Sequence, residues 1–426
     1  MQKFGVLGEH LTHSYSPRIH AELGDYEYKL FETKPEDLES FLKNGDFDGL
    51  NVAIPYKQAV IEYCSSLSMD ARAAGSVNTI IRNYDGSLHG DTTDSFGFMY
   101  LLSKIRTGGQ ENRLPVLCSL VLLSTNDKIL ILGSGGSSQC VQTVLNDLGM
   151  KQMVVISRTG PDNYDNISKH YDATTIINTT PVGMFPNNGE SPLSDLSKFT
   201  NCQMIIDLIY NPPHTKLLFD AEKYGIPSVS GLPMLVAQAK RSAELFLGSS
   251  IHNAKIDEII TKIECDTRNI VLIGMPGCGK TEIGAALSER MGREFADTDA
   301  RVEKTAGKPI SDIIEKDGED AFRKLENEAL EAICKRSGLV IATGGGVVKR
   351  EENRDILRQN GTIIYLNRDI SELETSGRPL SKKDGVEKLA AERLPLYSAW
   401  ADFTMKVRGV PETTDAILQY WEGMYS

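Results

Sequence analysis

Residues 274–281 read Gly274-Met275-Pro276-Gly277-Cys278-Gly279-Lys280-Thr281, a complete G-x-x-x-x-G-K-[ST] phosphate loop. Glycines let backbone N–H groups curl around phosphate oxygens, the lysine reaches the β- and γ-phosphates, and the threonine hydroxyl can ligate magnesium. An apolar run at 269–273 precedes the loop and suits a buried strand, and helical periodicity follows at 281–291. The alternative is a glycine-rich turn with a chance Lys-Thr, which the strand, loop and helix order disfavours. The stretch therefore predicts a nucleotide-binding α/β domain in the last third of the chain.

The size and charge of the chain narrow its class. It has 426 residues, 40% of them apolar and 24% charged, and a formal net charge of −12. This length accommodates about two or three domains, and the composition is typical of a soluble globular protein. Since no basic run interrupts the acidic balance, we expect neither a nucleic-acid partner nor binding to an anionic membrane.

Cysteine usage and the N-terminus favour a cytoplasmic protein. The seven cysteines contain no C-x-x-C pair, which argues against a zinc site or a disulfide framework and predicts free thiols. The first residues lead directly into a strand-like segment without the apolar region of a signal peptide. The longest apolar stretch, 114–123, is far shorter than the roughly 20 residues that span a bilayer, and we expect it to pack against a domain. The oligomeric state cannot be read from this sequence.

Short β-like runs alternate with helical patterns along the chain. This alternation predicts α/β domains with largely parallel sheets. We predict three domains: 1–95 together with 232–265, 96–231, and 268–426. The helical patterns at 232–247 and 256–263 are expected to fold back onto the first domain. The join near residue 266 has no Gly/Ser or Pro tract and therefore predicts a tight junction.

A second glycine-rich turn lies in the predicted middle domain. Gly133-Ser134-Gly135-Gly136-Ser137-Ser138 follows an apolar run and precedes a helical pattern. This order is typical of a dinucleotide-binding turn, here with Ser138 in place of the third glycine. The next predicted strand ends in Ser157-Arg158-Thr159, where NAD-binding proteins usually have a carboxylate. An arginine there suits the 2′-phosphate of NADP, although a solvated arginine at a strand end is the alternative.

Further motifs occur in order ahead of residue 265: His13-Ser14-Tyr15-Ser16-Pro17, Asn51-Val52-Ala53-Ile54-Pro55-Tyr56-Lys57, Gly75-Ser76-Val77-Asn78-Thr79, Gly90-Asp91-Thr92-Thr93-Asp94, Ile177-Asn178-Thr179-Thr180-Pro181-Val182-Gly183-Met184, Asp207-Leu208-Ile209-Tyr210-Asn211-Pro212 and Gly231-Leu232-Pro233-Met234-Leu235-Val236-Ala237-Gln238-Ala239. Together they resemble the shikimate dehydrogenase family along nearly all of 1–265. The resemblance implies a substrate-binding catalytic domain and a Rossmann-like NADP domain. It also implies that Ser14 and Ser16 hold the substrate carboxylate, and that Lys57 and Asp94 form the catalytic pair. The ring and its hydroxyls would be contacted by Asn78, Asp94, Tyr210 and Gln238, and the cofactor by Gly133, Ser134, Gly135, Gly136, Ser137, Ser157, Arg158, Thr159 and Gly231.

The chemistry of ketone reduction supports the roles of Lys57 and Asp94. A ring ketone needs a hydride from NADPH and a proton for the developing alkoxide, and an ammonium group supplies both the proton and a countercharge. Asp94 would orient the lysine and bind a neighbouring hydroxyl. The alternative is a plain surface ion pair, worth at most about 1 kcal/mol. A quinate dehydrogenase that uses NAD is a rival for this part of the chain, and Arg158 speaks against it.

Motifs downstream of the phosphate loop carry a second resemblance: Asp297-Thr298-Asp299, Ala321-Phe322-Arg323-Lys324-Leu325-Glu326, Thr343-Gly344-Gly345-Gly346, Gly377-Arg378-Pro379-Leu380 and Glu392-Arg393-Leu394-Pro395-Leu396-Tyr397. In that order they resemble shikimate kinase from 268 to about 422. The resemblance implies Lys280 and Thr281 on ATP and Mg²⁺, with Asp297 near the metal through water. Shikimate would be surrounded by Asp299, Arg323, Gly345 and Arg393, and the nucleotide by Gly277, Cys278, Gly279, Lys280, Thr281 and Arg378.

Phosphoryl transfer needs positioning and cationic stabilisation more than covalent chemistry. Arg323 and Arg393 can clamp a carboxylate through paired hydrogen bonds, which lysine cannot reproduce. Asp299 could accept the proton of the attacking hydroxyl or only orient it. Arg378, on a lid, would approach the transferring phosphate.

The sequence thus predicts a bifunctional enzyme. Its front part would reduce 3-dehydroshikimate with NADPH, and its rear part would phosphorylate shikimate to shikimate 3-phosphate with Mg-ATP. The alternative is an active dehydrogenase with a degenerate, regulatory kinase-like domain. Glu374, which lies where related lids often carry an arginine, motivates this alternative.

Overall fold

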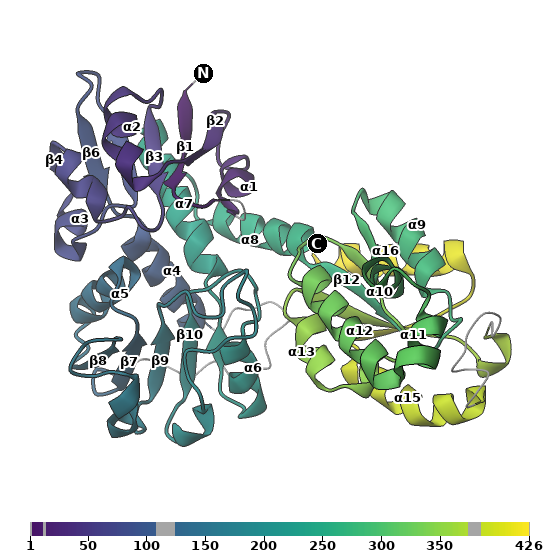
Figure 1. Ribbon diagram of the computed structural model, residues 1–426. Helices are drawn as coiled ribbons and strands as arrows, with labels where there is room; N and C mark the ends of the chain where they lie inside the picture. Colours follow the sequence, from purple (N-terminus) through teal and green to yellow (C-terminus); the bar gives the residue numbers. More distant parts are fainter. Residues whose placement is uncertain (1, 12–13, 108–123, 374–384, 426) are drawn as a thin grey trace. The chain divides into compact units, whose positions relative to one another are not determined.

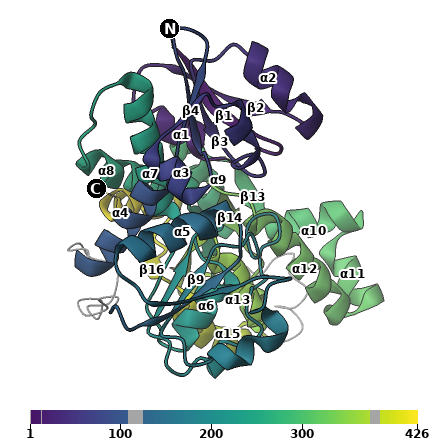
Figure 2. The same cartoon turned by 90° about the vertical axis from the view of Figure 1, so that its left-hand side faces the viewer.

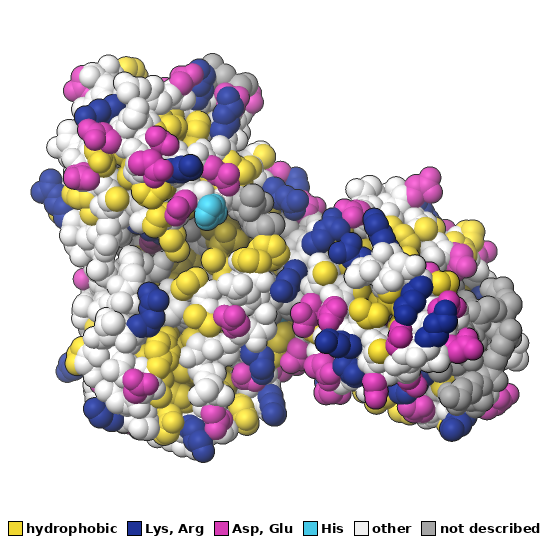
Figure 3. Space-filling view, viewed as in Figure 1, with side chains coloured by type: hydrophobic (Ala, Val, Ile, Leu, Met, Phe, Trp, Pro, Cys, Tyr) yellow, Lys and Arg dark blue, Asp and Glu magenta, His cyan; other side chains and the backbone are white. Residues whose placement is uncertain are grey.

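The computed structural model describes residues 2–11, 14–107, 124–373 and 385–425, so the apolar stretch 114–123 lies outside the described residues. The chain forms two compact units (Figure 1). Unit 1 comprises 1–184, 190–213 and 217–263, and unit 2 comprises 185–189, 214–216 and 264–426. No helix in the described part of the chain combines the length and apolarity needed to cross a bilayer. On the face drawn in Figure 3, cationic and anionic side chains are interspersed on each unit.

The first sheet of unit 1 has six strands in the order β2-β1-β3-β5-β6-β4. Their bounds are β1 Lys3–Gly8, β2 Glu27–Glu32, β3 Gly49–Val52, β4 Ser66–Leu67, β5 Thr79–Arg82 and β6 Leu88–Asp91. Strands β1, β2 and β3 are parallel, whereas β5 runs antiparallel to both β3 and β6. The sheet is therefore mixed rather than largely parallel, because a tight turn with Gly86 at φ 83° joins β5 directly to β6. Helices α1 Ser16–His20, α2 Leu38–Asn44 and α3 Met69–Ala74 accompany it.

The second sheet of unit 1 has five parallel strands in the order β11-β10-β9-β7-β8. Its strands are β7 Lys128–Leu132, β8 Gln152–Ile156, β9 Thr175–Asn178, β10 Met204–Asp207 and β11 Ser228–Val229, with helices α5 Gly136–Asp147 and α6 Lys216–Lys223. Strands β9 and β10 are buried along their whole length, as expected when helices cover both faces of a parallel sheet. The glycine-rich turn after β7 thus opens a helix, as the sequence predicts.

Helices α4 Asp94–Thr107 and α7 Leu232–Leu247 pack against each other. Between them they contribute side chains to the hydrophobic clusters of both parts of unit 1, the part with the first sheet and the part with the second. Phe98 of α4 and Met234 of α7 share a hydrophobic cluster with Ile129 of β7. The opposite side of α7 contributes Val236 to a cluster with α1 and with α8 Ala254–Thr267. Helix α7 therefore packs against the first part of the chain as well. Figure 2 shows α5 beside α4 and α3, which it contacts.

Unit 2 contains a third sheet of five parallel strands in the order β13-β14-β12-β15-β16, which confirms the predicted α/β kinase-type fold. The strands are β12 Asn269–Ile273, β13 Phe295–Asp297, β14 Val340–Ala342, β15 Gly361–Asn367 and β16 Phe403–Lys406. The helices are α9 Lys280–Met291, α10 Thr298–Ala306, α11 Ile310–Asp317, α12 Glu319–Cys334, α13 Glu352–Arg358, α15 Val386–Trp400 and α16 Val410–Met424. Every residue of the central strand β12 is buried, so the loop that follows it starts from a rigid support.

Candidate active sites

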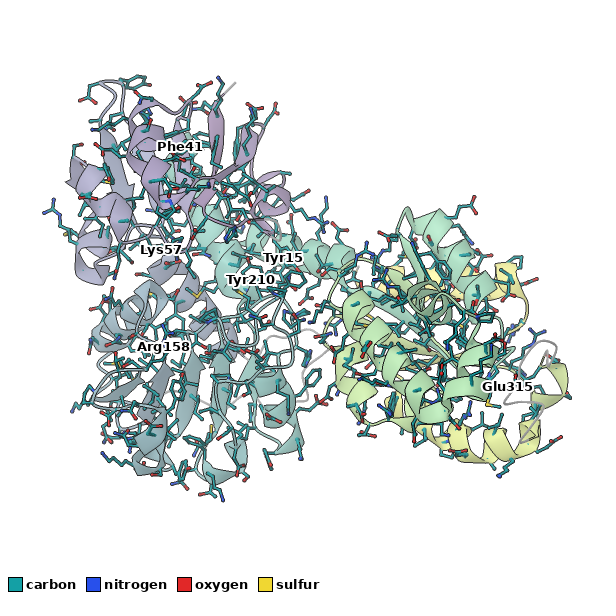
Figure 4. The ribbon with its side chains drawn as sticks, in the orientation of Figure 1. Tyr15, Phe41, Lys57, Arg158, Tyr210 and Glu315 are labelled. Carbon is teal, nitrogen blue, oxygen red and sulfur yellow. The ribbon has the colours of Figure 1, made fainter. Side chains whose placement is uncertain are left out.

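Lys57 and Asp94 meet in unit 1. Lys57 follows β3, Asp94 opens α4, and Lys57 Nζ donates a hydrogen bond of 2.6 Å to Asp94 Oδ2. Only 18% of the Lys57 side chain and 2% of the Asp94 side chain are exposed, so this is no ordinary surface ion pair. Figure 4 labels Lys57 on its loop. A lysine that is anchored by a buried carboxylate and still partly open can present its ammonium group to a substrate.

Two of the predicted ring contacts join the same cluster. Asn78 Nδ2 donates to Asp94 Oδ1 at 2.9 Å and to Gln238 Oε1 of α7 at 3.2 Å. The backbone N–H of Thr93 donates to Asn78 Oδ1 at 2.8 Å, and this bond fixes which way the amide points. Segments far apart in the sequence therefore bring Lys57, Asp94, Asn78 and Gln238 together.

The remaining predicted substrate contacts lie around the start of α1. Ser14 Oγ accepts a hydrogen bond of 3.2 Å from the backbone N–H of Ser16. Tyr15, between these serines, packs on Tyr210 with ring centroids 5.2 Å apart, and Figure 4 shows the pair. Burial raises the pKa of Tyr210 to about 12, so its hydroxyl stays neutral at physiological pH and can donate a hydrogen bond.

The glycines of the dinucleotide turn, and Gly231, are each glycine for a different structural reason. Gly133 has φ 105°, and a Cβ there would lie 2.8 Å from Thr179 Oγ1. A Cβ at Gly135 would meet no atom within 4 Å, so this part of the turn is open to a ligand. A Cβ at Gly136 would lie 3.9 Å from Lys57 Cδ, which places the start of α5 beside the lysine. At Gly231, a Cβ would lie 2.0 Å from the carbonyl oxygen of Leu208, so this glycine allows two backbone segments to touch.

Ser157, Arg158 and Thr159 follow β8 in a tight loop. The backbone N–H of Gly160 donates to Ser157 Oγ at 2.8 Å, and that of Ser157 donates to the carbonyl of Asp162 at 3.1 Å. The loop leaves Arg158 and Thr159 exposed, and Figure 4 labels Arg158 on this second part of unit 1. Exposure is expected of a 2′-phosphate contact and of a solvated arginine alike.

In unit 2 the phosphate loop joins β12 to α9. Positive φ angles at Gly277 and Gly279, of 83° and 101°, explain why glycine occupies these positions. Lys280 is only 8% exposed, and its Nζ donates to the carbonyl oxygens of Gly274 at 2.9 Å and Met275 at 3.0 Å. Cys278 Sγ lies 3.9 Å from the same Nζ. The lysine is thus held inside the curve of the loop.

Thr281 and Asp297 form the predicted metal pair. Thr281 Oγ1 donates to Asp297 Oδ2 at 2.9 Å. The other carboxylate oxygen of Asp297 caps α10 by accepting from the backbone N–H groups of Asp299 at 3.0 Å and Ala300 at 3.1 Å. The cap fixes the carboxylate so that one oxygen faces the end of the phosphate loop.

Asp299 and Glu326 place two carboxyl groups around Gly344. A Cβ at Gly344 would lie 2.5 Å from Asp299 Oδ1 and 2.7 Å from Glu326 Oε1, so only glycine fits there. Both of these oxygens are buried without a hydrogen-bond partner among the described atoms. Burial, together with the charges of Glu326 and Asp297, raises the pKa of Asp299 to about 7. Asp299 therefore titrates in the range where a general base is most effective.

The two arginines predicted to bind a carboxylate are both buried. Arg323 Nη1 donates to Glu326 Oε2 at 2.7 Å and Nη2 to Glu319 Oε1 at 3.1 Å, while Arg393 Nη1 donates to the Gly345 carbonyl at 2.9 Å. The Nε atoms of both arginines lack a partner within the described structure. Buried donors without partners are uncommon and indicate a site for a bound anion. A Cβ at Gly346 would lie 2.3 Å from Arg323 Nη1, so the glycine triplet makes room for this guanidinium.

Some contributing residues were not assigned roles from the sequence, and one assigned residue is not described. Glu326 stands three positions after Arg323, and Tyr397, whose hydroxyl also donates to the Gly345 carbonyl, stands four after Arg393. These spacings place each residue on the same helix face as its arginine, which was the available signal. Arg378 and its motif lie outside the described residues.

Two family models and several relatives match parts of this chain. Residues 6–80 match the model of the shikimate dehydrogenase substrate binding domain. A shikimate dehydrogenase (NADP(+)) of Methanopyrus kandleri is 34% identical over 274 residues, which cover 57% of this chain and 89% of that protein. The chain belongs to the shikimate dehydrogenase family. Residues 276–421 match the shikimate kinase model, so the chain also carries a shikimate kinase domain.

Solved structures show the same relationship for the front part of the chain. Shikimate dehydrogenase 1 of Peptoclostridium difficile is 33% identical with a TM-score of 0.54, covering 62% of this chain and 98% of that one. The enzyme of Thermus thermophilus, solved in complex with NADP(H) and shikimate, is 28% identical with a TM-score of 0.52, covering 62% of this chain and 99% of that one. These neighbours are similar to the front part of the chain, and the shikimate kinase domain follows that part in the sequence.

Proposed function

We propose that this chain catalyses two successive reactions. Residues 1–95 with 232–265 bind 3-dehydroshikimate, 96–231 bind NADPH, and together they reduce the ketone to shikimate. Residues 268–426 then transfer a phosphoryl group from Mg-ATP to the 3-hydroxyl of shikimate. The observation that carries the second step is the set of buried donors and acceptors without partners on Arg323, Arg393, Asp299 and Glu326. Such a set suits a small polyhydroxy acid that carries one carboxylate.

In the dehydrogenase part, NADPH supplies the hydride when bound. The open turn at Gly135, the neighbouring Ser134 and Ser137, and the exposed Arg158 fit a dinucleotide with a 2′-phosphate. Lys57 delivers the proton to the developing alkoxide while Asp94 holds its ammonium group in place. Ser14 and Ser16 hold the carboxylate of the ring, and Asn78, Tyr210 and Gln238 recognise its hydroxyls. The related Thermus thermophilus enzyme, with NADP(H) and shikimate in its structure, supports this choice of ligands.

In the kinase part, the phosphate loop suits ATP because its N–H groups and Lys280 surround the position of a phosphate chain. Thr281 and the capped Asp297 are hard oxygen ligands adjacent to this loop, which suits Mg²⁺. Magnesium would neutralise charge on the phosphates when bound. Asp299 accepts the proton of the attacking hydroxyl, and Arg323 and Arg393 hold the carboxylate. Arg378 is proposed to approach the transferring phosphate.

The rival of a regulatory, inactive rear domain is disfavoured by the described site. A degenerate kinase would be expected to lose its phosphate loop lysine, its capped aspartate or its buried arginines. Lys280, Asp297, Arg323 and Arg393 are all present and supported by hydrogen bonds. We therefore favour catalysis over regulation.

Two assays on the purified chain test the proposal. We expect NADPH consumption with 3-dehydroshikimate, and ADP release with shikimate and Mg-ATP, each dependent on its own substrates. NADH should replace NADPH poorly, because Arg158 would lose its phosphate partner. Dehydrogenase activity without ADP release at saturating shikimate would support the regulatory rival. Faster turnover of quinate with NAD than of shikimate with NADP would overturn the assignment of the front part.

The raised pKa of Asp299 predicts how phosphorylation depends on pH. Below a pH of about 7 Asp299 is protonated and cannot accept the hydroxyl proton, so kcat/KM for shikimate should fall about tenfold per pH unit on the acid side. Above that pH the rate should level off. Measurement of ADP release at saturating Mg-ATP across the neutral range checks this, with Asp299→Asn as the variant that should lack the acid limb. A profile that stays flat well below neutrality would contradict the role of Asp299 as a base.

A further inference from the structure

Ser242 is a fully buried hydroxyl on α7, one helical turn after Gln238. Its Oγ lies 2.7 Å from Asn51 Nδ2, 2.9 Å from Thr79 Oγ1 and 3.1 Å from Thr93 Oγ1. It also donates to the Gln238 carbonyl at 3.0 Å. A single hydroxyl thus joins α7 to β3, to β5 and to the segment before α4. These same elements support the Lys57 and Asp94 pair.

The hydrogen-bonding capacity of Ser242 is fully used. A serine hydroxyl has one hydrogen to donate and two lone pairs to accept with. If its hydrogen goes to the Gln238 carbonyl, it accepts from the Asn51 amide and from one threonine hydroxyl. Thr79 can donate instead to Asn78 Oδ1 at 3.0 Å, which leaves Thr93 as the second donor to Ser242. This assignment satisfies all three residues around the serine.

From Thr93 the hydrogen bonds continue to the reacting pair. Thr93 Oγ1 lies 3.1 Å from Asn78 Nδ2, which also lies 2.9 Å from Asp94 Oδ1 and 3.2 Å from Gln238 Oε1, so the two amide hydrogens are shared among these three acceptors. Asp94 in turn holds Lys57 through its second oxygen. Each of Asn78, Thr93 and Asp94 is at most 5% exposed, so water does not compete for these bonds.

On its other side, Ser242 connects toward the predicted carboxylate contacts. Asn51 Oδ1 accepts a hydrogen bond of 2.7 Å from the hydroxyl of Tyr28. Tyr28 also interacts with the Ser16 side chain, which partly offsets the strong rise of the Tyr28 pKa that burial causes. The hydrogen bonds therefore extend from Tyr28 of β2 to the ammonium group of Lys57.

We propose that Ser242 is a positioning residue for the reduction of 3-dehydroshikimate. Through Thr93 and Asn78 it fixes the carboxylate of Asp94, and thereby the direction in which Lys57 presents its proton. Replacement by alanine removes an acceptor from two donors, the Nδ2 of the half-buried Asn51 and the Oγ1 of the buried Thr93. Buried groups that lose a partner find new ones by moving, and Asn78 Oδ1 lies 3.3 Å from Thr93 Oγ1 as a new acceptor. The inference rests on the proposed roles of Lys57 and Asp94.

Ser242→Ala tests this inference in the full-length chain. We expect kcat for 3-dehydroshikimate to fall about tenfold, the KM for NADPH to stay within about twofold, and the solvent isotope effect on kcat to increase. The isotope effect is the decisive readout, because proton delivery becomes slower when Lys57 is misdirected. If Ser242 had a purely structural role, Ser242→Ala would lower the thermal unfolding midpoint and leave the solvent isotope effect unchanged.

Thr92→Val is the matched control. Thr92 is 3% exposed and its Oγ1 has no hydrogen-bond partner among the described atoms, so this variant also deletes a buried hydroxyl near Asp94. It should retain the solvent isotope effect of the parent chain. If Ser242→Ala retains kcat and the isotope effect, or if Thr92→Val changes them equally, the inference is wrong. Full activity in Lys57→Ala would instead refute the proposed catalytic pair.

Discussion

Lys57→Ala should abolish most of the dehydrogenase activity, with kcat for 3-dehydroshikimate lowered by about 10³-fold. General acid catalysis by a positioned side chain typically contributes about 10²- to 10⁴-fold, and Lys57 also offsets the charge of the alkoxide. The variant leaves Asp94 buried at 1% exposure without its cation, although Asn78 still donates to it. NADPH consumption measured at saturating substrates gives kcat, and fluorescence titration with NADPH shows whether the cofactor still binds.

Lys57→Arg is the informative control for this variant. It retains a positive charge beside Asp94, but a guanidinium does not release a proton near neutral pH. If Lys57 acts as the proton donor, the arginine variant should be nearly as slow as the alanine variant. If the lysine contributed only charge, the arginine variant would recover much of the rate. ADP release with shikimate should be unchanged in both, and its loss would contradict independent sites.

Features that depend on a short segment alone, such as a glycine-rich loop between a strand and a helix, could be predicted from the sequence. The phosphate loop lies between β12 and α9, as its motif predicts. The glycines at 277 and 279 permit the positive φ angles that its backbone adopts. The turn 133–138 likewise sits between β7 and α5. The antiparallel pairing of β5 with β3 and β6 was not anticipated, because short runs such as 88–91 carry little periodicity and the expectation of parallel strands came from the chain as a whole.

The same holds for the site residues: those within short motifs could be predicted from the sequence, whereas those defined by contacts between distant segments could not. Motif residues such as Lys57, Asp94 and Asn78 were named from the sequence, and the structure brings them together. The contribution of Ser242 was not readable, because a serine on the inner face of an amphipathic helix has no pattern that distinguishes it from other small core residues. Its three side-chain partners lie between 149 and 191 positions away in the chain, so only the fold reveals them.

Lys280→Ala should have the largest effect on phosphorylation, with ADP release in the presence of shikimate lowered by about 10³-fold or more. Preorganised charge at the transferring group is the main contribution that a protein makes to phosphoryl transfer. Lys280 Nζ is held at the Gly274 and Met275 carbonyls, inside the loop that would surround the phosphates. An alanine leaves the loop without its cation. The fold should persist, because β12 and the apolar face of α9 are unchanged.

Lys304→Ala provides the matched control, since Lys304 is an exposed lysine on α10 in the same unit. It changes the net charge equally and should leave ADP release within about twofold, because exposed charges away from a site contribute little. NADPH consumption should be unchanged in both variants. Equal loss in Lys280→Ala and Lys304→Ala would show that ADP release depends on overall charge rather than on the loop. A normal rate in Lys280→Ala would mean that phosphoryl transfer does not depend on the lysine of this loop.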